Sequence, residues 1–169
     1  MNITFIGMAG VGKSAIGNKL AQELNYKFVD IDKLIEKKFK LKLQEIVDKF
    51  GEDKFLKIEE NEVLGLRKIS NCVISPGGSV IYSPKAMEFL KRNSLIVFLN
   101  SPFETIKNRI KNQNNRGLIG LKKNNLKNLF DKRFPLYKKY ADIIIEIPEN
   151  LDIDSAVGKV KEKIFDICP

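Results

Sequence analysis

Short apolar runs alternate with longer amphipathic segments along the whole chain. Five of the runs are rich in Ile, Val, Leu and Phe and predict β-strands. They span residues 3–6, 26–29, 71–74, 94–99 and 142–147. Between them, apolar residues recur at helical spacing. The predicted helices span residues 15–24, 33–50, 54–68, 84–92, 102–111, 122–140 and 152–167, and Pro135 interrupts the pattern of the sixth.

This alternation predicts an α/β fold, because parallel strands need crossover connections that are usually helical. We expect a three-layer α/β/α sandwich with a five-stranded parallel sheet. The apolar run 94–99 is typical of a strand covered on both faces, and the run 142–147 predicts a last buried strand. Residues 112–120 are polar, contain glycine and lack a period, which predicts a mobile loop. A chain of 169 residues without repeats or linkers predicts one domain, 1–169.

The clearest chemical signal lies between the first strand and the first helix. Residues 7–14, GMAGVGKS, have the spacing G-x-x-x-x-G-K-S of a phosphate-binding loop. Lys13 would reach the β- and γ-phosphates of a nucleotide, and the Ser14 hydroxyl would bind Mg²⁺. The alternative, a glycine-rich turn that binds nothing, is disfavoured by the strand before it and the helix after it. The predicted nucleotide-binding residues here are Gly10, Val11, Gly12, Lys13, Ser14 and Ala15.

Two carboxylates follow the second predicted strand. Strand alternation places Asp30 and Asp32 on one face at the carboxyl end of that strand. Ligands bind at that end in open α/β sheets, which makes both aspartates candidate site residues. The alternative is that one of them, Asp32, only caps the following helix.

Composition limits the class of protein. No apolar run approaches the roughly 20 residues of a membrane span, and the N-terminus lacks the order of a signal peptide, so we expect a soluble chain without a membrane partner. Cys72 and Cys168 give no disulfide framework, which favours a cytoplasmic location. The net charge of +9 could indicate nucleic acid. However, the lysines are spread among acidic residues, so no nucleic-acid partner is expected, and a nucleotide ligand accounts for part of the excess.

Together these motifs resemble the shikimate kinase family, within the nucleoside-monophosphate-kinase-like group of P-loop kinases. The resemblance covers nearly the whole chain, and the order and spacing of its motifs make it specific. The matching residues are 7–14, Asp30 and Asp32, Gly51-Glu52-x-x-Phe55 with Glu59, Gly77-Gly78, Arg109, Arg116-x-Leu118, and Arg133-x-Pro135-Leu136-Tyr137.

The resemblance implies an ATP-dependent kinase of shikimate that uses Mg²⁺ and acts as a monomer. It implies a substrate-binding helical region over residues 33–62 and a lid over residues 112–124. The implied catalytic residues are Lys13, Asp32 and Arg116, with Asp32 acting as or near the general base and Arg116 closing onto the phosphoryl group. The implied binding roles are Asp30 for Mg²⁺ through water, Asp32, Gly77, Gly78 and Arg133 for the acceptor, and Arg109 for adenine, with Pro148 as the opposite wall.

Three positions depart from the family pattern. Leu56 stands where the family has an arginine that binds a carboxylate, Ser79 replaces the third glycine of a Gly-Gly-Gly turn, and Gly117 replaces the lid proline. Leucine cannot replace a bidentate guanidinium. Two alternatives therefore stay open: the same chemistry on another hydroxylated metabolite, and a nucleotide-binding regulatory protein without transfer activity.

Overall fold

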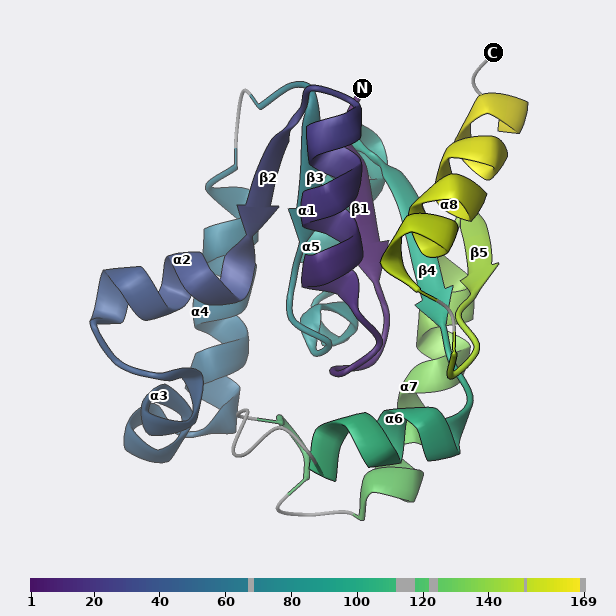
Figure 1. The fold of residues 1–169 in the computed structure, drawn as a ribbon. Helices are drawn as coiled ribbons and strands as arrows, with labels where there is room; N and C mark the ends of the chain where they lie inside the picture. The colour runs from purple at the N-terminus through teal and green to yellow at the C-terminus, as the bar shows by residue number, and fades with distance from the viewer. Residues whose placement is uncertain (67–68, 112–117, 122–124, 151, 168–169) are drawn as a thin grey trace.

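The computed structural model has a five-stranded, wholly parallel sheet between layers of helices (Figure 1). It describes every residue except 67–68, 112–117, 122–124, 151 and 168–169. The strands are β1 (Ile3–Ile6), β2 (Lys27–Asp30), β3 (Cys72–Ser75), β4 (Leu95–Asn100) and β5 (Ile143–Glu146), in the spatial order β2-β3-β1-β4-β5. The predicted α/β fold and its five-stranded parallel sheet are confirmed.

The helices cover both faces of this sheet, with α1 and α8 in front of it in Figure 1 and α5 behind it. They are α1 (Lys13–Glu23), α2 (Ile31–Phe39), α3 (Leu43–Phe50), α4 (Glu52–Leu64), α5 (Pro84–Asn93), α6 (Phe103–Lys111), α7 (Leu126–Tyr140) and α8 (Ile153–Ile167), with a 3₁₀ turn η1 (Val80–Tyr82). No helix among the described residues is both long enough and apolar enough to cross a membrane.

The core follows the central strands. All residues of β1 and β3 are buried, as are the middle four of β4. The last strand, which the sequence predicted to be buried, is only half buried, because β5 lies at the sheet edge and its residues alternate between buried and exposed. Ile144, for example, is 40% exposed.

The predicted helix over residues 33–50 is two helices. The chain leaves α2 at Lys40, which adopts a left-handed conformation with φ 55°, and α3 begins at Leu43. The apolar spacing continues across this break, because Phe39 and Leu43 are four residues apart, and the pattern therefore concealed it. The rings of Phe39 and Phe50 meet edge to face with centroids 5.7 Å apart, which packs the two helices together.

Proline does not divide α7. The helix runs unbroken from Leu126 to Tyr140 with Pro135 inside it, whereas the sequence predicted an interruption there. Its first turn is capped by Asn125, whose side chain accepts a hydrogen bond from the Asn128 N–H at 2.8 Å.

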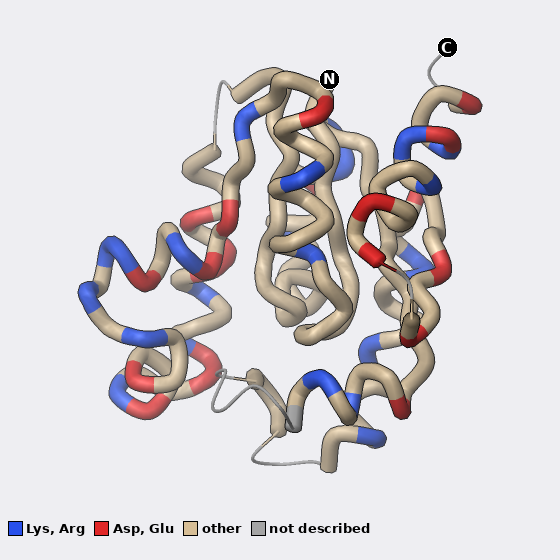
Figure 2. The backbone as a smooth tube through the Cα atoms, in the orientation of Figure 1, with Lys and Arg blue, Asp and Glu red and all other residues tan. Residues whose placement is uncertain are grey.

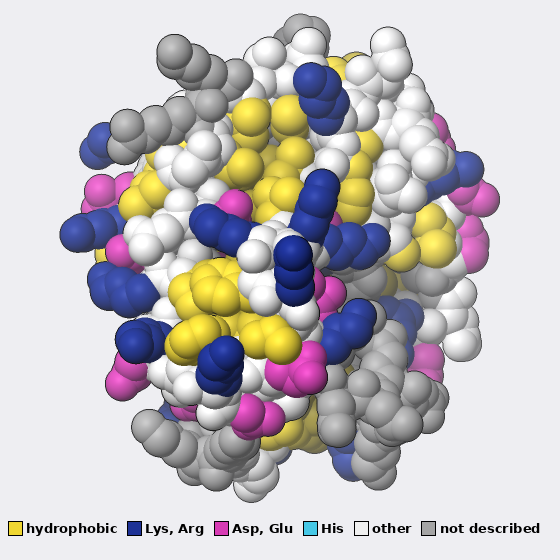
Figure 3. Space-filling view, turned by 90° about the vertical axis from the view of Figure 1, so that its left-hand side faces the viewer, with side chains coloured by type: hydrophobic (Ala, Val, Ile, Leu, Met, Phe, Trp, Pro, Cys, Tyr) yellow, Lys and Arg dark blue, Asp and Glu magenta, His cyan; other side chains and the backbone are white. Residues whose placement is uncertain are grey.

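Charged positions of both signs are interspersed on the helices around an almost uncharged sheet (Figure 2). The face formed by β2 and α2–α4 also shows areas of apolar side chains between these charges (Figure 3). The partly buried apolar residues of these elements are Phe28, Val29, Leu34, Phe39, Leu43, Phe50, Leu56 and Ile58.

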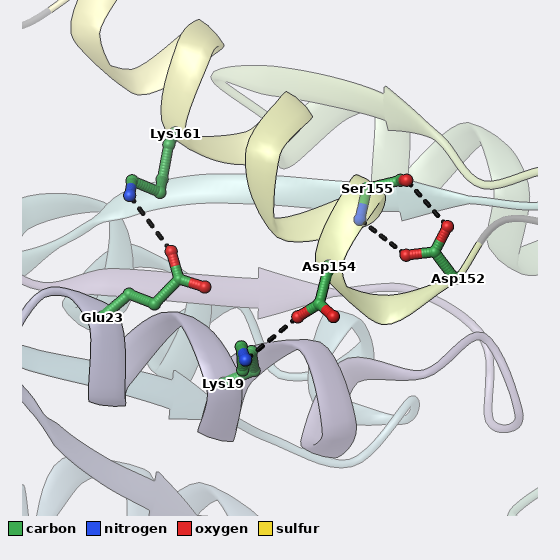
Figure 4. A network of polar contacts seen from close by, with 6 residues as sticks. All are labelled: Lys19, Glu23, Asp152, Asp154, Ser155 and Lys161. Atoms are coloured by element: carbon green, nitrogen blue, oxygen red, sulfur yellow. Dashed lines mark hydrogen bonds and ion pairs between the residues drawn. The ribbon is translucent and has the colours of Figure 1, made fainter.

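Two ion pairs link α1 to α8 (Figure 4). Lys19 contacts Asp154, and Lys161 contacts Glu23, each at 3.0 Å. Such exposed pairs contribute about 0–1 kcal/mol each. The position of α1 therefore depends mainly on how its buried face packs against the sheet.

Gly17 makes that packing close, which gives a stability prediction. A Cβ at Gly17 would lie 2.7 Å from Phe28 Cε2 and 3.3 Å from Phe5 Cδ2. Overpacking costs about 1–3 kcal/mol, which exceeds the roughly 0.8–1 kcal/mol that alanine gains over glycine in a helix. We expect Gly17→Ala to lower the free energy of unfolding in urea by about 1 kcal/mol.

The matched control is Gly158→Ala in α8. No atom lies within 4 Å of a Cβ at this position, so the helix propensity should act alone and stabilise the protein by up to about 1 kcal/mol. Equal effects of the two substitutions would show that Gly17 is not closely packed.

Candidate functional site

A cavity of about 260 Å³ opens at the carboxyl ends of β1, β2 and β3. The phosphate loop after β1 forms one side and the turn over residues 75–79 after β3 forms another, while Asp32, Phe55 and Arg133 project from α2, α4 and α7. Of the predicted site residues, it brings together Gly10, Gly12, Lys13, Ser14, Ala15, Asp32, Gly77, Gly78 and Arg133. Ligands of open parallel sheets bind at this edge.

The phosphate loop has the backbone that its glycines predict. Gly7, Gly10 and Gly12 have φ values of 144°, 82° and 108°, which residues with a side chain rarely adopt. Gly12 caps α1 without a side-chain hydrogen bond, and no acidic residue lies in the first turn. The first N–H groups of α1 therefore remain available to an anion, whose charge the helix dipole favours.

Lys13 is held inside this loop. Its Nζ donates to the backbone oxygens of Gly7 at 2.8 Å and Met8 at 3.1 Å. Burial lowers the pKa of Lys13 to about 8, an effect that Asp32 partly offsets and Arg133 reinforces. A buried cation of this kind is well placed to exchange loop carbonyls for the oxygens of a polyphosphate.

The structure separates the roles of the two aspartates. Asp30 is the N-cap of α2, since its Oδ1 accepts from the Lys33 N–H at 3.1 Å, and its Oδ2 accepts from the Ser14 hydroxyl at 2.8 Å. The alternative that Asp32 only caps the helix after the second strand is therefore wrong. The alternation argument is also wrong, because α2 begins at Ile31 and Asp32 reaches the cavity from the first turn of the helix.

Ser14 and Asp30 fit a Mg²⁺ site. Both offer oxygen atoms, which this hard cation prefers, and they meet at the edge of the phosphate loop. No cluster of three Cys, Asp or Glu side chains suited to a metal occurs in the part of the chain that the structure describes. Mg²⁺ commonly binds one or two protein groups while water and phosphate supply the other ligands.

The acceptor side of the cavity is built around Gly78 and Arg133. A Cβ at Gly78 would lie 3.0 Å from Arg133 Nη1 and 3.2 Å from the Tyr137 hydroxyl, so only glycine fits without displacement. Arg133 is 1% exposed, and its Nη2 donates to the Ile119 backbone oxygen at 2.8 Å. Its Nε donates to the Tyr82 hydroxyl at 3.3 Å. These contacts fix the guanidinium beside the turn.

Two residues had no assigned role in the sequence analysis although its motifs contained them. Tyr137 is fully buried and donates to the Gly78 backbone oxygen at 2.6 Å, and burial raises the pKa of its phenol. Glu59 is 1% exposed, and burial together with Asp32 raises the pKa of its carboxyl to about 7. The signal for Glu59 was its position midway between Phe55 and Val63 on the apolar stripe of α4.

The remaining predicted residues either lie around the cavity or fall outside the residues that the structure describes. Val11 is buried, and its backbone oxygen accepts from Arg109 at 3.2 Å. Arg109 also donates to the Glu149 backbone oxygen at 3.2 Å, which joins the phosphate loop to the segment that follows Pro148. Arg116 lies outside the described residues, as do Gly117 and most of the predicted lid.

Leu56 does not line this cavity. It lies in a neighbouring shallow depression together with Tyr82, whose ring lies 5.3 Å from the guanidinium carbon of Arg133. Leucine at this position offers no cation to an acceptor carboxylate.

A phosphate loop that faces a polar cavity at the carboxyl edge of a parallel sheet defines the P-loop class of α/β proteins. Within this class, the profile described as "Shikimate kinase" matches residues 9–165. The chain belongs to the shikimate kinase family.

Individual relatives agree with this assignment. The chain is 38% identical to the shikimate kinase of Lactococcus lactis, with 96% of this chain and 98% of the relative covered. It is 37% identical to that of Thermodesulfovibrio yellowstonii, with 94% and 92% covered. Among solved structures, shikimate kinase from Aquifex aeolicus superposes with a TM-score of 0.86 at 32% identity, covering 99% of this chain and 98% of that one. The enzyme from Acinetobacter baumannii in complex with shikimate gives 0.84 at 29%, covering 99% and 92%.

Proposed function

We propose that this chain transfers the γ-phosphoryl group of ATP to a hydroxyl of shikimate. The observation that carries the proposal is one cavity in which Lys13 of the phosphate loop lies opposite Asp32 and Arg133. Membership of the shikimate kinase family and the solved relative in complex with shikimate support this acceptor.

The proposed roles follow from the geometry. The phosphate loop, over residues 10–15, binds the triphosphate, and Lys13 neutralises its charge. Ser14 would hold Mg²⁺ directly and Asp30 would do so through water, and the bound ion would neutralise charge on the phosphates. Arg109 contacts the adenine side of the nucleotide, and Arg116 is proposed to stabilise the transferring group, as the family resemblance implies.

Asp32 is the proposed general base, while Gly77, Gly78 and Arg133 hold the acceptor. Arg133 would bind the carboxylate of shikimate, because a guanidinium makes strong charge-assisted hydrogen bonds to such a group. The acceptor oxygen bonds to the γ-phosphorus while the bond from phosphorus to the bridging oxygen breaks. ADP leaves, and the proton of the hydroxyl passes to Asp32.

We further propose one domain over residues 1–169, with an acceptor-binding helical region over 33–62 and a lid over 112–124, acting as a monomer in the cytoplasm. Leu56 was the main reason to consider another acceptor. The shikimate kinases among the relatives favour shikimate.

An ADP-release assay with shikimate and a panel of related polyols tests this function. We expect ATP- and Mg²⁺-dependent turnover on shikimate, with a KM of about 1 mM or lower, as is usual for enzymes. Turnover on a related polyol but not on shikimate would contradict the acceptor. Nucleotide binding without turnover on any acceptor would instead favour a regulatory protein.

A further inference from the structure

Glu59 is a buried carboxyl with one satisfied oxygen and one unsatisfied oxygen. It lies on the inner face of α4 and is 1% exposed. Its Oε2 accepts a hydrogen bond from the Ser79 hydroxyl at 2.7 Å. Its Oε1 is buried and has no hydrogen-bond partner among the residues that the structure describes. Buried polar atoms without a partner are rare in native structures and call for an explanation.

The unsatisfied oxygen points toward the acceptor turn. A Cβ built on Gly77 would clash with Glu59 Oε1 and would also lie 2.9 Å from Asp32 Oδ1. The two carboxyl groups therefore approach the same side of Gly77. Asp32 and Gly77 line the cavity, whereas Glu59 lies beneath the turn, behind Ser79 and Gly77.

We propose that Ser79 and Glu59 form a positioning unit for the acceptor: the Ser79 hydroxyl fixes one carboxyl oxygen of Glu59, so that the other stays against Gly77 beside Asp32. This unit sets how far the turn over residues 75–79 projects into the cavity where the acceptor binds. It also sets the negative charge beside the proposed base, Asp32. The inference rests on the proposed function and adds a role for a residue that departs from the family pattern.

The same contact links the two departures at positions 56 and 79. Leu56 precedes Glu59 by three residues on α4, and side chains with this spacing are neighbours on a helix. An arginine at position 56 would place a cationic donor within reach of Glu59. This chain has a neutral leucine there, and the Ser79 hydroxyl supplies a donor from the turn before η1 instead.

The charges around Glu59 give the unit a measurable signature. Asp32 faces it from α2, Lys13 from α1 and Arg133 from α7. Burial and Asp32 raise the pKa of Glu59, while the Ser79 hydrogen bond, Arg133 and Lys13 lower it, with a balance at about 7. Loss of the Ser79 hydroxyl should therefore move the pKa of Glu59 further upward.

The test is Ser79→Ala, assayed for kcat and for the KM values of shikimate and ATP between about pH 5.5 and 9. We expect the KM for shikimate at neutral pH to rise about tenfold, because the loss of one charge-assisted hydrogen bond accounts for a change of this size. The KM for ATP should stay unchanged. The midpoint of the pH dependence of the shikimate KM should move to higher pH. Ser79→Thr, which keeps a hydroxyl, should restore both values.

Three further variants sharpen the result. Ser83→Ala is the matched control, because Ser83 donates to Glu60 of α4 at 2.6 Å, as Ser79 donates to Glu59, but lies away from the main cavity. It should leave the KM for shikimate unchanged. Glu59→Gln cannot ionise and should abolish the pH midpoint. In a Leu56→Arg background, Ser79→Ala should have a smaller effect, since arginine would supply the second donor.

The outcomes separate this inference from the proposed function. A wild-type chain without turnover on shikimate would overturn both. Turnover by the wild type, combined with an unchanged shikimate KM and pH midpoint in Ser79→Ala, would overturn the positioning role alone. An effect of Ser79→Ala on thermal unfolding alone would also overturn the positioning role, because it would show that the hydrogen bond between Ser79 and Glu59 only stabilises the fold.

Discussion

Lys13→Ala should reduce kcat by about 10²–10³-fold, the usual loss when a preorganised group that stabilises transition-state charge is removed. In the structure its Nζ is already inside the phosphate loop, bonded to the Gly7 and Met8 oxygens. Alanine leaves the loop glycines intact, so nucleotide binding should weaken less than turnover. An ADP-release assay at saturating ATP and shikimate measures the effect.

Lys19→Ala is the matched control. Lys19 lies on the same helix, one and two-thirds turns further on, and makes an exposed pair with Asp154. It should retain the wild-type kcat. A Lys13→Ala variant with near-wild-type kcat would show that phosphoryl transfer does not occur at this loop.

The same lysine predicts a pH dependence. Since burial lowers the pKa of Lys13 to about 8, the free enzyme loses this charge as pH rises through that value. We therefore expect kcat/KM for ATP to fall above about pH 8. The corresponding fall in kcat should occur at higher pH, because bound phosphates favour the charged form of Lys13. In Lys13→Ala, kcat/KM for ATP should no longer fall in this pH range.

The parts of the fold that depend on near neighbours could be predicted from sequence. The strand, loop and helix around residues 3–24 depend on apolar runs and glycine spacing within a few residues, and the structure reproduces them. The break at Lys40 could not be predicted in this way, because the apolar period passes through it without a change. The edge position of β5 depends on which strands pair, which no local pattern contains.

The residues of the site differ in the same way in how far they could be predicted from local sequence. Residues within a motif, such as Lys13 and Ser14, were predicted because one short segment contains all that their placement requires. The contact between Ser79 and Glu59 joins residues 20 positions apart, and the contact between Tyr137 and Gly78 joins residues 59 apart. Such contacts arise only when the sheet order brings α4, α7 and the turn after β3 together. A buried charge on an apolar stripe was the only local sign of Glu59.

Asp32→Asn should lower kcat by about 10²–10⁴-fold, the contribution typical of a positioned general base. The amide keeps the size of the carboxylate but cannot accept the proton of the acceptor hydroxyl. Folding should be little affected, because Asp30, not Asp32, caps α2. The KM for ATP should change little, since the phosphate loop is untouched. Steady-state kinetics and thermal unfolding of the same preparation measure these effects.

The comparison with Asp154→Asn isolates the role of the site. Both aspartates lie in the first turn of a helix, so both substitutions remove a favourable interaction with a helix dipole. Only Asp32 faces the cavity that contains Lys13 and Arg133. Equal and small losses of kcat in the two variants would mean that Asp32 supports its helix and that the acceptor loses its proton to another group. A large loss confined to Asp32→Asn would support this carboxylate as the base, because Asp154 lies outside the cavity and pairs with Lys19.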